Sequence, residues 1–365
     1  MLDIWFEGIE VSQNKYESYQ LGSNILINKG RVPDLKDVSI AIFGVNGEEM
    51  KGIRQQLYAL RDPIKSLKIV DLGNLRKNDL SFAIPVIKEL LDSKIIPVFI
   101  CGDPFMQLAQ YKAFQGNHQA ASLVLVDDRI RLNPGGKIST EGGYFLNEAL
   151  FNKNSRLFHL SCVGYQIQYV APDIVDFLDQ HHFDHIRLGM SRKDLTEVEP
   201  LVRDGDIMSI HLAAMKQIEC PFITEVSPSG FFSEEICQIS RYAGLSDKMK
   251  SLGIYGFDFT KDPNHTGAEC IAQIIWYFLE GVGSRFRDFP VSTAGLTEYI
   301  VELKKLDYQL TFWKSNKSGR WWLQVPVKTK KQLERHRLIP CSYQDYQMAC
   351  RDELPDRLFH ALRRF

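Results

Sequence analysis

Residues 97–104 read Pro97-Val98-Phe99-Ile100-Cys101-Gly102-Asp103-Pro104, an apolar run that ends in a glycine, a carboxylate and a proline. A short run that is apolar throughout is typical of a strand that is buried on both faces. Strands of this kind form parallel sheets covered by helices, and ligands bind at the carboxyl ends of such strands. The stretch therefore predicts a covered parallel sheet with a polar edge near Asp103.

The same pattern recurs on both sides of this stretch, up to about residue 290. Apolar runs alternate with helical patterns, which implies βαβ units and a doubly wound sheet. We expect an α/β fold of three layers, with a mostly parallel sheet of eight strands between two layers of helices. The expected strands are Val38 to Val45, Leu67 to Leu72, Ile95 to Cys101, Leu123 to Asp127, Leu157 to Val163, Ile186 to Met190, Ile207 to Leu212 and Ile254 to Phe259. The expected helices include Ser81 to Asp92, Phe105 to Gln115, Pro172 to Gln180, Ser233 to Ala243 and Thr266 to Gly281.

The pattern changes after Phe289-Pro290, where short strand-like and aromatic segments replace the alternation. Turn residues Ser315 to Gly319 separate two of these segments, and Ser342 is suited to cap a final helix. We expect a main domain at residues 1–290 and an extension at residues 291–365, built from a small β-hairpin and a helix. The strand-like segments are Tyr299 to Leu303, Tyr308 to Lys314 and Trp321 to Val327.

Several motifs of the main domain, taken in order, resemble the ureohydrolase family, which includes arginase, agmatinase and formimidoylglutamase. The resemblance covers roughly residues 35 to 285 and rests on an ordered set of short matches. These are Phe43-Gly44-Val45, Asp71-Leu72-Gly73-Asn74, and Cys101-Gly102-Asp103 where the family has G-G-D-H-S. The tail, with Arg320-Trp321-Trp322 and Pro340-Cys341-Ser342, resembles that of arginase-like proteins of Bacteroidetes-type bacteria. The resemblance implies an arginase-like fold and, for a complete member, two Mn²⁺ ions that activate water.

The metal-binding motifs of the family are degenerate in this chain. The family's G-D-H reads Gly102-Asp103-Pro104, its D-A-H-x-D reads Asp127-Asp128-Arg129-Ile130-Arg131, and its D-x-D reads His211-Leu212-Ala213. Proline and alanine side chains offer no donor atom, and arginine has no acceptor lone pair and remains protonated. A guanidinium ~4 Å from a divalent ion would be repelled by about twice the ~4 kcal/mol of a unit-charge pair at an effective dielectric near 20. The sequence therefore predicts no Mn²⁺ pair, no other cofactor and no catalytic residues.

Other parts of the family's chemistry are also missing. The resemblance places a proton-shuttling histidine in the loop at Glu141 to Asn147, which contains none, and a substrate-binding glutamate near Thr260 to Pro263, which holds a lysine. Positions 127, 129 and 131 share one face of an extended segment. We therefore expect Arg129 or Arg131 to form an ion pair with Asp103 or Asp127, in place of the two metal ions.

Three functions stay open from these residues. The first is a non-catalytic protein of this fold, a pseudoenzyme that acts as a scaffold, regulator or protein-binding module. The second is a metal-dependent hydrolase of a linear amidine or guanidine with displaced ligands, for example Asp103, Asp127, Asp128 and His211. The third is a metal-free sensor in which Arg129 and Arg131 hold a small anion.

Composition narrows the class of partner. The net charge is −1, which argues against nucleic acid as the main partner, and no apolar run is long enough for membrane insertion. The chain starts without a secretory pattern, and its seven cysteines contain no C-x-x-C, as expected for reduced thiols in a cytoplasmic protein. We expect a protein partner or self-association through the aromatic extension, since aromatic residues are enriched at interface cores. The candidate surface is Trp313, Trp321, Trp322, Tyr343 and Tyr346.

Overall fold

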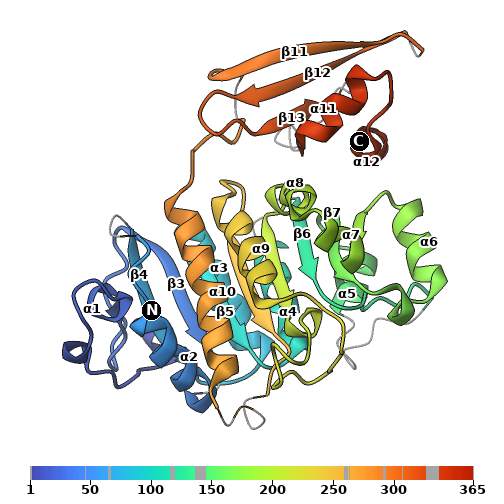
Figure 1. The fold of residues 1–365 in the computed structure, drawn as a ribbon. Helices are drawn as coiled ribbons and strands as arrows, with labels where there is room; N and C mark the ends of the chain where they lie inside the picture. The colour runs from blue at the N-terminus through green and yellow to red at the C-terminus, as the bar shows by residue number, and fades with distance from the viewer. Residues whose placement is uncertain are drawn as a thin grey trace.

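The computed structural model describes residues 2–45, 47–64, 67–115, 120–135, 145–258, 262, 264–290, 293–305, 307–325 and 337–364. The chain forms two units, which we call the sheet domain (up to residue 290) and the C-terminal module (from residue 293). The module lies beside one end of the sheet domain, beyond the last residues of helix α10 (Figure 1).

The sheet domain contains a ten-stranded sheet, with strand order β1-β4-β3-β5-β10-β9-β6-β7-β8 and β2 paired to β4. The eight strands from β4 to β8 in this order run parallel, as predicted, and β1 adds a short antiparallel edge. The strands are β1 (Phe6–Glu7), β2 (Leu26–Ile27), β3 (Val38–Gly44), β4 (Lys68–Leu75), β5 (Ile96–Cys101), β6 (Ala121–Val126), β7 (Leu157–Tyr165), β8 (Asp184–Arg187), β9 (Ile207–His211) and β10 (Ser251–Tyr255).

Two strands end earlier than the apolar runs predicted. β8 stops at Arg187, because Arg187 is the N-terminal cap of helix α7, which takes up the apolar residues that follow. β10 stops at Tyr255, because Gly256 adopts a φ of 84°, a left-handed conformation that ends the extended backbone. Apolar runs locate these strands correctly but do not show where the backbone turns.

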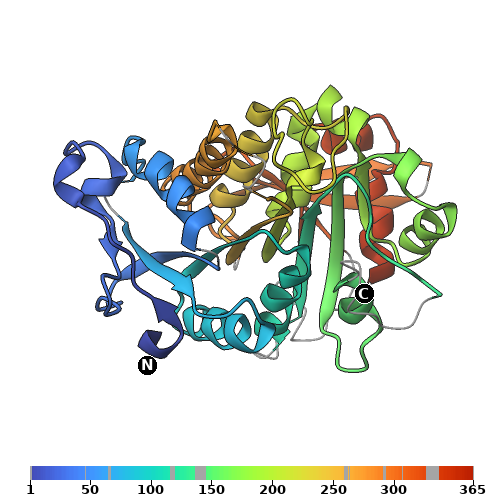
Figure 2. The ribbon, with the colours of Figure 1, turned by 90° about the horizontal axis from the view of Figure 1, so that it is seen from below.

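Helices cover both faces of the sheet, so the domain has the predicted three layers (Figure 2). α2, α8, α9 and α10 pack together on one face, and α3, α4 and α5 pack together on the other. The α-helices are α1 (Leu21–Asn24), α2 (Gly47–Ala59), α3 (Leu80–Asp92), α4 (Gln107–Gln115), α5 (Phe145–Phe151), α6 (Pro172–Gln180), α7 (Leu188–Lys193), α8 (Val198–Arg203), α9 (Ser233–Leu245) and α10 (Thr266–Gly283). Short 3₁₀ helices include η3 (Pro104–Met106), η5 (Leu195–Glu197) and η6 (Leu212–Ala214).

Helix α3 shows how the sequence determines one of these elements. Asp79 caps its N-terminus by accepting a hydrogen bond from the Ser81 backbone N–H. Its buried positions Ala83, Val86, Ile87 and Leu90 recur every three or four residues, the period of one helix face. That face packs in the apolar cluster that includes Val70 and Phe99 on β4 and β5.

The C-terminal module is an antiparallel sheet of order β11-β12-β13-β14, with helices packed on one side. It is larger than the expected hairpin and helix, since it also contains β14 and a second helix. Its core is separate from that of the sheet domain and includes Leu310, Phe312 and Leu323. The predicted cap at Ser342 is present, because the Ser342 hydroxyl accepts a hydrogen bond from the Asp345 N–H. The elements are β11 (Leu296–Leu303), β12 (Tyr308–Ser315), β13 (Trp321–Gln324), β14 (Leu338–Cys341), α11 (Tyr343–Cys350) and α12 (Asp356–Arg364).

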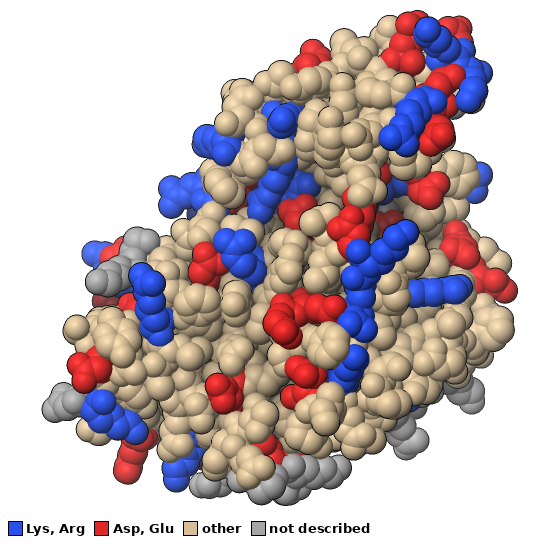
Figure 3. Space-filling view, viewed as in Figure 1, with Lys and Arg blue, Asp and Glu red and all other residues tan. Residues whose placement is uncertain are grey.

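Two general properties of the surface and helices bear on function. Within the described ranges, no helix is both long and apolar enough to cross a membrane. On the face drawn in Figure 3, basic and acidic side chains are intermixed over the sheet domain and the module. This mixture agrees with the nearly neutral net charge.

Candidate functional site

The positions that correspond to metal ligands lie at the carboxyl edge of the sheet, where parallel strands end together. Asp127 follows β6, and His211 is the last residue of the neighbouring strand β9. The Asp127 carboxylate and the His211 imidazole lie 3.8 Å apart, between Oδ1 and Nδ1. The fold therefore brings together two of the positions that the sequence singled out.

The ion pair predicted between an arginine and Asp127 is present. Arg131 Nε lies 2.9 Å from Asp127 Oδ2, and only 8% of the Arg131 side chain is exposed. The other side of the guanidinium reaches Glu225, with Nη1 2.8 Å from Oε1. Arg131 therefore lies between two carboxylates and supplies positive charge at the edge of the sheet.

Arg129 completes the cluster from the more open side. Its guanidinium bonds the buried Asp128 at 2.9 Å and Glu225 at 2.9 Å, and it lies over the Tyr169 ring at 5.0 Å. Both arginines therefore already have acidic partners within the chain. Asp128 and Glu225 were not expected as these partners, and Glu225 lies 94 residues beyond Arg131 without a motif to reveal it.

Asp103, the alternative acidic partner, forms no ion pair with either arginine among the described residues. Asp103 is exposed, and its carboxylate accepts a hydrogen bond from the Phe105 N–H at 2.9 Å. Pro104 occupies the first turn of η3, so Asp103 acts as the N-terminal cap of that short helix. The preference of an N-terminal cap for aspartate explains why Asp103 is suited to this place without any metal.

His211 also has a local structural role. Its Nδ1 accepts a hydrogen bond from the Ala213 N–H at 3.1 Å, which caps η6. Because Nδ1 accepts, the proton of the neutral ring is on Nε2, a buried atom without a partner among the described residues. Burial, together with the positive charge of Arg131, lowers the pKa of His211 to about 3. The 3.8 Å approach to Asp127 is therefore between two acceptors and is not an ion pair at neutral pH.

A close glycine accommodates the ring of His211. A Cβ atom at Gly256 would lie only 2.4 Å from the imidazole. The same glycine has the left-handed φ that ends β10, so both the backbone and the contact require glycine there. The position of His211 is thus supported by the neighbouring strand.

Burial and the neighbouring charges together set the pKa values of the cluster. Burial raises the pKa of the Asp127 carboxyl, and the nearby Arg131 guanidinium opposes part of this rise. Burial lowers the pKa of Arg131, but attraction to Asp127 and Glu225 outweighs that effect, so the pKa is raised. Arg131 therefore stays charged at every physiological pH.

These residues do not fit the Mn²⁺ pair of the family. Both Asp127 oxygens accept hydrogen bonds, Oδ1 from the Asp128 N–H and Oδ2 from Arg131. The lone pair of His211 Nδ1 is used by Ala213, and Ala213 itself has no donor side chain. The cavity beside Asp127 and Arg131 measures about 10 Å³, which is roughly the space for one water molecule. In the described part of the chain, no three His, Cys, Asp or Glu side chains form a metal-binding group.

The two other positions that the family resemblance singled out lie largely outside the described residues. These are the loop at residues 141–144 and residues 260, 261 and 263. Of the described neighbours, Asn147 bonds the backbone of Asn133 through both ends of its amide, at 2.9 and 3.0 Å. Asp262 accepts hydrogen bonds from the Gly267 and Ala268 N–H groups at the start of α10. Both side chains therefore shape the backbone.

The candidate aromatic surface of the module is only partly exposed. Trp321 is 7% exposed and Trp322 is 1% exposed, so the expectation that they present an interaction surface is wrong. Trp321 stacks on Tyr346 at 4.8 Å inside the module, because alternate residues of β13 face its helices. Trp313 is half-buried and donates from Nε1 to Gln324, whereas Tyr343 is 54% exposed.

Trp322 faces the sheet domain, where a buried arginine holds the module. The Arg203 guanidinium lies 4.6 Å from the Trp322 ring and donates to the Trp321 and Cys341 carbonyl oxygens, each at 3.2 Å. Arg203 also pairs with Glu199 at 2.9 Å. The role of Arg203, the last residue of α8, was not predicted from the sequence. The only signal in the sequence is an arginine that directly follows the apolar residues Leu201 and Val202.

Comparison with solved structures supports the architecture. A formiminoglutamase from Trypanosoma cruzi, described with Mn²⁺, matches with a TM-score of 0.61 and 14% identity, over 68% of this chain and 95% of that one. The formimidoylglutamase of Bacillus subtilis matches with a TM-score of 0.60 and 16% identity, over 69% and 90% of the two chains. The agmatine ureohydrolase of Thermoplasma volcanium matches with a TM-score of 0.57 and 14% identity, over 74% and 96%.

The chain has the arginase-like ureohydrolase fold. No protein-family model matches it, and no curated protein matches its sequence. At identities of 14–16% the solved structures establish the fold and leave the activity open. The ureohydrolase resemblance of the sequence is thus confirmed at the level of architecture.

Proposed function

We propose that this chain is a non-catalytic protein of the ureohydrolase fold, which acts by binding protein as a scaffold or regulator. The observation that carries this proposal is the position of Arg131 between Asp127 and Glu225, at 2.9 and 2.8 Å. A charged guanidinium occupies the edge where the fold's enzymes would need carboxylates free to bind cations. Without bound cations, the edge has no means of lowering the pKa of a water molecule toward 7.

Two other functions receive less support from the same residues. A hydrolase with displaced ligands would need Asp103 together with Asp127, but Asp103 caps η3 at the surface. A sensor that binds an anion through Arg129 and Arg131 would have to displace carboxylates that already pair with both.

Metal content and activity test the proposal together. The purified chain is incubated with excess MnCl₂, desalted and analysed for manganese, and release of urea, formamide or ammonia is measured with arginine, agmatine and N-formimidoylglutamate. We expect manganese well below one ion per chain and no product above the buffer. Stoichiometric manganese with product release, abolished by a chelator and by Asp127→Ala, would contradict the proposal.

We propose that the partner surface is the edge strand β11 of the module, and that the partner is a second copy of the chain. β11 is eight residues long and, among the described residues of the module, pairs with β12 alone. Its Ile300 is 60% exposed, and an open edge of this length is a template for pairing with another strand. An antiparallel pair centred on Val301 would place Glu298 of each copy opposite Lys304 of the other, so the charges are complementary.

A charge swap tests this pairing by light scattering or sedimentation. We expect Glu298→Lys to raise the dissociation constant of the dimer at least tenfold. Combining Glu298→Lys with Lys304→Glu should restore the original dissociation constant. The matched control is Glu302→Lys, which makes the same charge reversal on the same strand at a position that faces Ile300 in this register. A monomer at all concentrations, or equal effects of the single and the swapped variants, would refute the pairing.

A cytoplasmic location is part of the proposal. It is supported by the seven cysteines, all of which have free thiols and six of which are buried. Reduced thiols are typical of proteins kept in a reducing compartment.

A further inference from the structure

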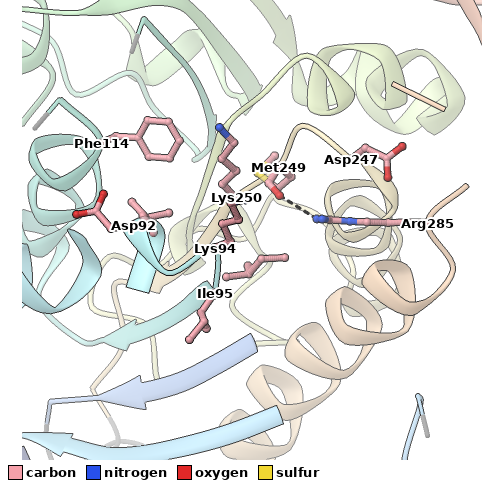
Figure 4. Close-up of a pocket in the computed structure, with 10 residues that line it drawn as sticks. Asp92, Lys94, Ile95, Phe114, Asp247, Met249, Lys250 and Arg285 are labelled. Atoms are coloured by element: carbon pink, nitrogen blue, oxygen red, sulfur yellow. Dashed lines mark hydrogen bonds between the residues drawn. The ribbon is translucent and has the colours of Figure 1, made fainter. Parts of the chain in front are cut away.

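A second cavity lies at the opposite edge of the sheet from Asp127. It measures about 630 Å³ and lies where β5 and β10 begin side by side, since these strands are parallel neighbours. Its walls come from the end of α3, from α4, from the loop before β10 and from the residues after α10 (Figure 4). Volumes of about 300–1,000 Å³ are typical of small-molecule sites.

A fixed arginine enters this cavity. Arg285 Nε donates to the Gly244 carbonyl and one of its terminal nitrogens to the Met249 carbonyl, each at 2.8 Å. These partners are neutral, and among the described residues no carboxylate lies within ion-pair distance of this guanidinium. Burial lowers the pKa of Arg285 to about 10, against the attraction of Asp247. The guanidinium is therefore positioned by the backbone and retains charge that no acidic side chain neutralises directly.

The acidic side chain that acts on Arg285, Asp247, forms hydrogen bonds with backbone N–H groups. Asp247 Oδ2 accepts hydrogen bonds from the Asp288 and Phe289 N–H groups, at 2.8 and 3.2 Å. In Figure 4 its carboxylate points away from Lys250. Asp247 thus holds the first residues of the connection to the module through one of its carboxylate oxygens.

Two lysines and an aromatic ring complete the lining. Lys250 crosses the cavity with Nζ 5.5 Å from the centre of the Phe114 ring. Lys94 lies in the turn before β5, at a left-handed φ of 59° that fixes the direction of its backbone. With Arg285 these residues bring three cations to walls that hold two carboxylates, Asp92 and Asp247.

We propose that this cavity binds a small organic anion, with a carboxylate or phosphate group on Arg285 and Lys250 and an apolar body against Phe114. Arginine suits this role, because its planar guanidinium recognises carboxylate and phosphate geometry. The apolar wall distinguishes such a ligand from an inorganic ion. The cavity lies at the opposite edge of the sheet from Asp127, and none of its lining residues belongs to β11. The proposal therefore does not depend on the absence of catalysis or on pairing between copies.

Calorimetric titration of the full chain at low salt tests the proposal with defined probes. These are phenyl phosphate, 3-phenylpropanoate, inorganic phosphate and the neutral 3-phenylpropanol. We expect at least one of the two aromatic anions to bind at submillimolar Kd, at least fivefold more tightly than inorganic phosphate and the alcohol. The stronger of the two anions identifies the acidic group that the cavity prefers.

Variants locate the binding site. Lys250→Gln is expected to weaken the better anion at least fivefold, and Arg285→Gln further if it folds. The matched control Lys68→Gln, at an exposed lysine that pairs with Asp37, should bind as the parent does. Failure of both anions to bind, equal binding of the alcohol or of inorganic phosphate, or unchanged affinity in Lys250→Gln would overturn the proposal.

Discussion

The carboxyl edge of the sheet and the junction with the C-terminal module both depend on a buried arginine, but they use it differently. Arg131 lies between two carboxylates of the sheet domain, Asp127 and Glu225, and forms ion pairs with both. Arg203 donates to two carbonyl oxygens of the module and lies against Trp322, so it joins two units. The same type of side chain thus neutralises carboxylates at one edge and connects two units at the other.

Removing the arginine should have a different effect at each site. At the carboxyl edge, the loss leaves desolvated negative charge, which is costly in a protein interior. At the junction, it leaves neutral carbonyl groups that can recover hydrogen bonds from water once the module moves away. The first site should therefore respond by global destabilisation and the second by separation of the units.

The largest expected effect is at the carboxyl edge. Arg131→Ala should lower the free energy of unfolding by about 3–5 kcal/mol, because it leaves Asp127 buried without its cation. Urea denaturation followed by circular dichroism measures the change. Asp127→Leu combined with Arg131→Met should recover most of the stability, since it removes both charges. Equal losses in the single and the double variant would show that packing, rather than charge, holds this edge.

The next effect is at the junction. Arg203→Met keeps the length of the side chain but leaves the Trp321 and Cys341 carbonyls without donors, and should destabilise docking by about 2–3 kcal/mol. We expect red-shifted tryptophan emission, as Trp322 becomes exposed, and faster proteolysis between the units. Arg192→Met, at a more exposed arginine that pairs with Glu235 on the sheet domain, is the control. Unchanged emission and proteolysis in Arg203→Met would mean that the module docks without this anchor.

A pH dependence follows from His211. Its pKa is about 3 in the folded chain, against 6.5 as the ordinary value, so the folded state binds fewer protons between these limits. The stability is complete above pH 6.5 and falls as the pH is lowered, by roughly 2 kcal/mol at pH 5. His211→Asn keeps an acceptor for the Ala213 N–H but does not titrate. Urea midpoints at pH 5 and 7 should therefore differ less in this variant, and identical pH slopes would exclude His211 as the cause.

The smallest effect is at Asp103. Asp103→Ala removes an exposed N-terminal cap and should cost about 1 kcal/mol, far less than the loss of Arg131. Asp103→Ser, which can also cap, should cost less still. A loss as large as that of Arg131→Ala would place Asp103 in the buried cluster after all.

The sequence predicted the sheet well because each strand is a local apolar run with a clear length. It also predicted the Arg131–Asp127 pair, since the two residues share a short segment that a motif already placed at the carboxyl edge. It could not predict Glu225 or Arg203, because their partners are distant in the chain and their own surroundings carry no pattern. The prediction that Trp321 and Trp322 of β13 form an interaction surface was wrong for a related reason. Aromatic composition does not reveal whether a ring packs on its own chain or on another.

The position of β10 has a consequence for the order in which the chain can assemble. β10 is the last strand of the large sheet in sequence, yet it lies in the middle and joins β5 to β9. Until residue 255 has left the ribosome, two partial sheets have open edges where β10 will insert, and such edges promote aggregation. The module has no such delay, because each of its strands pairs with the next one along the chain, a local arrangement that favours fast folding. The slow step of folding is therefore expected at the centre of the sheet domain, with the module ready to dock as soon as α8 is in place.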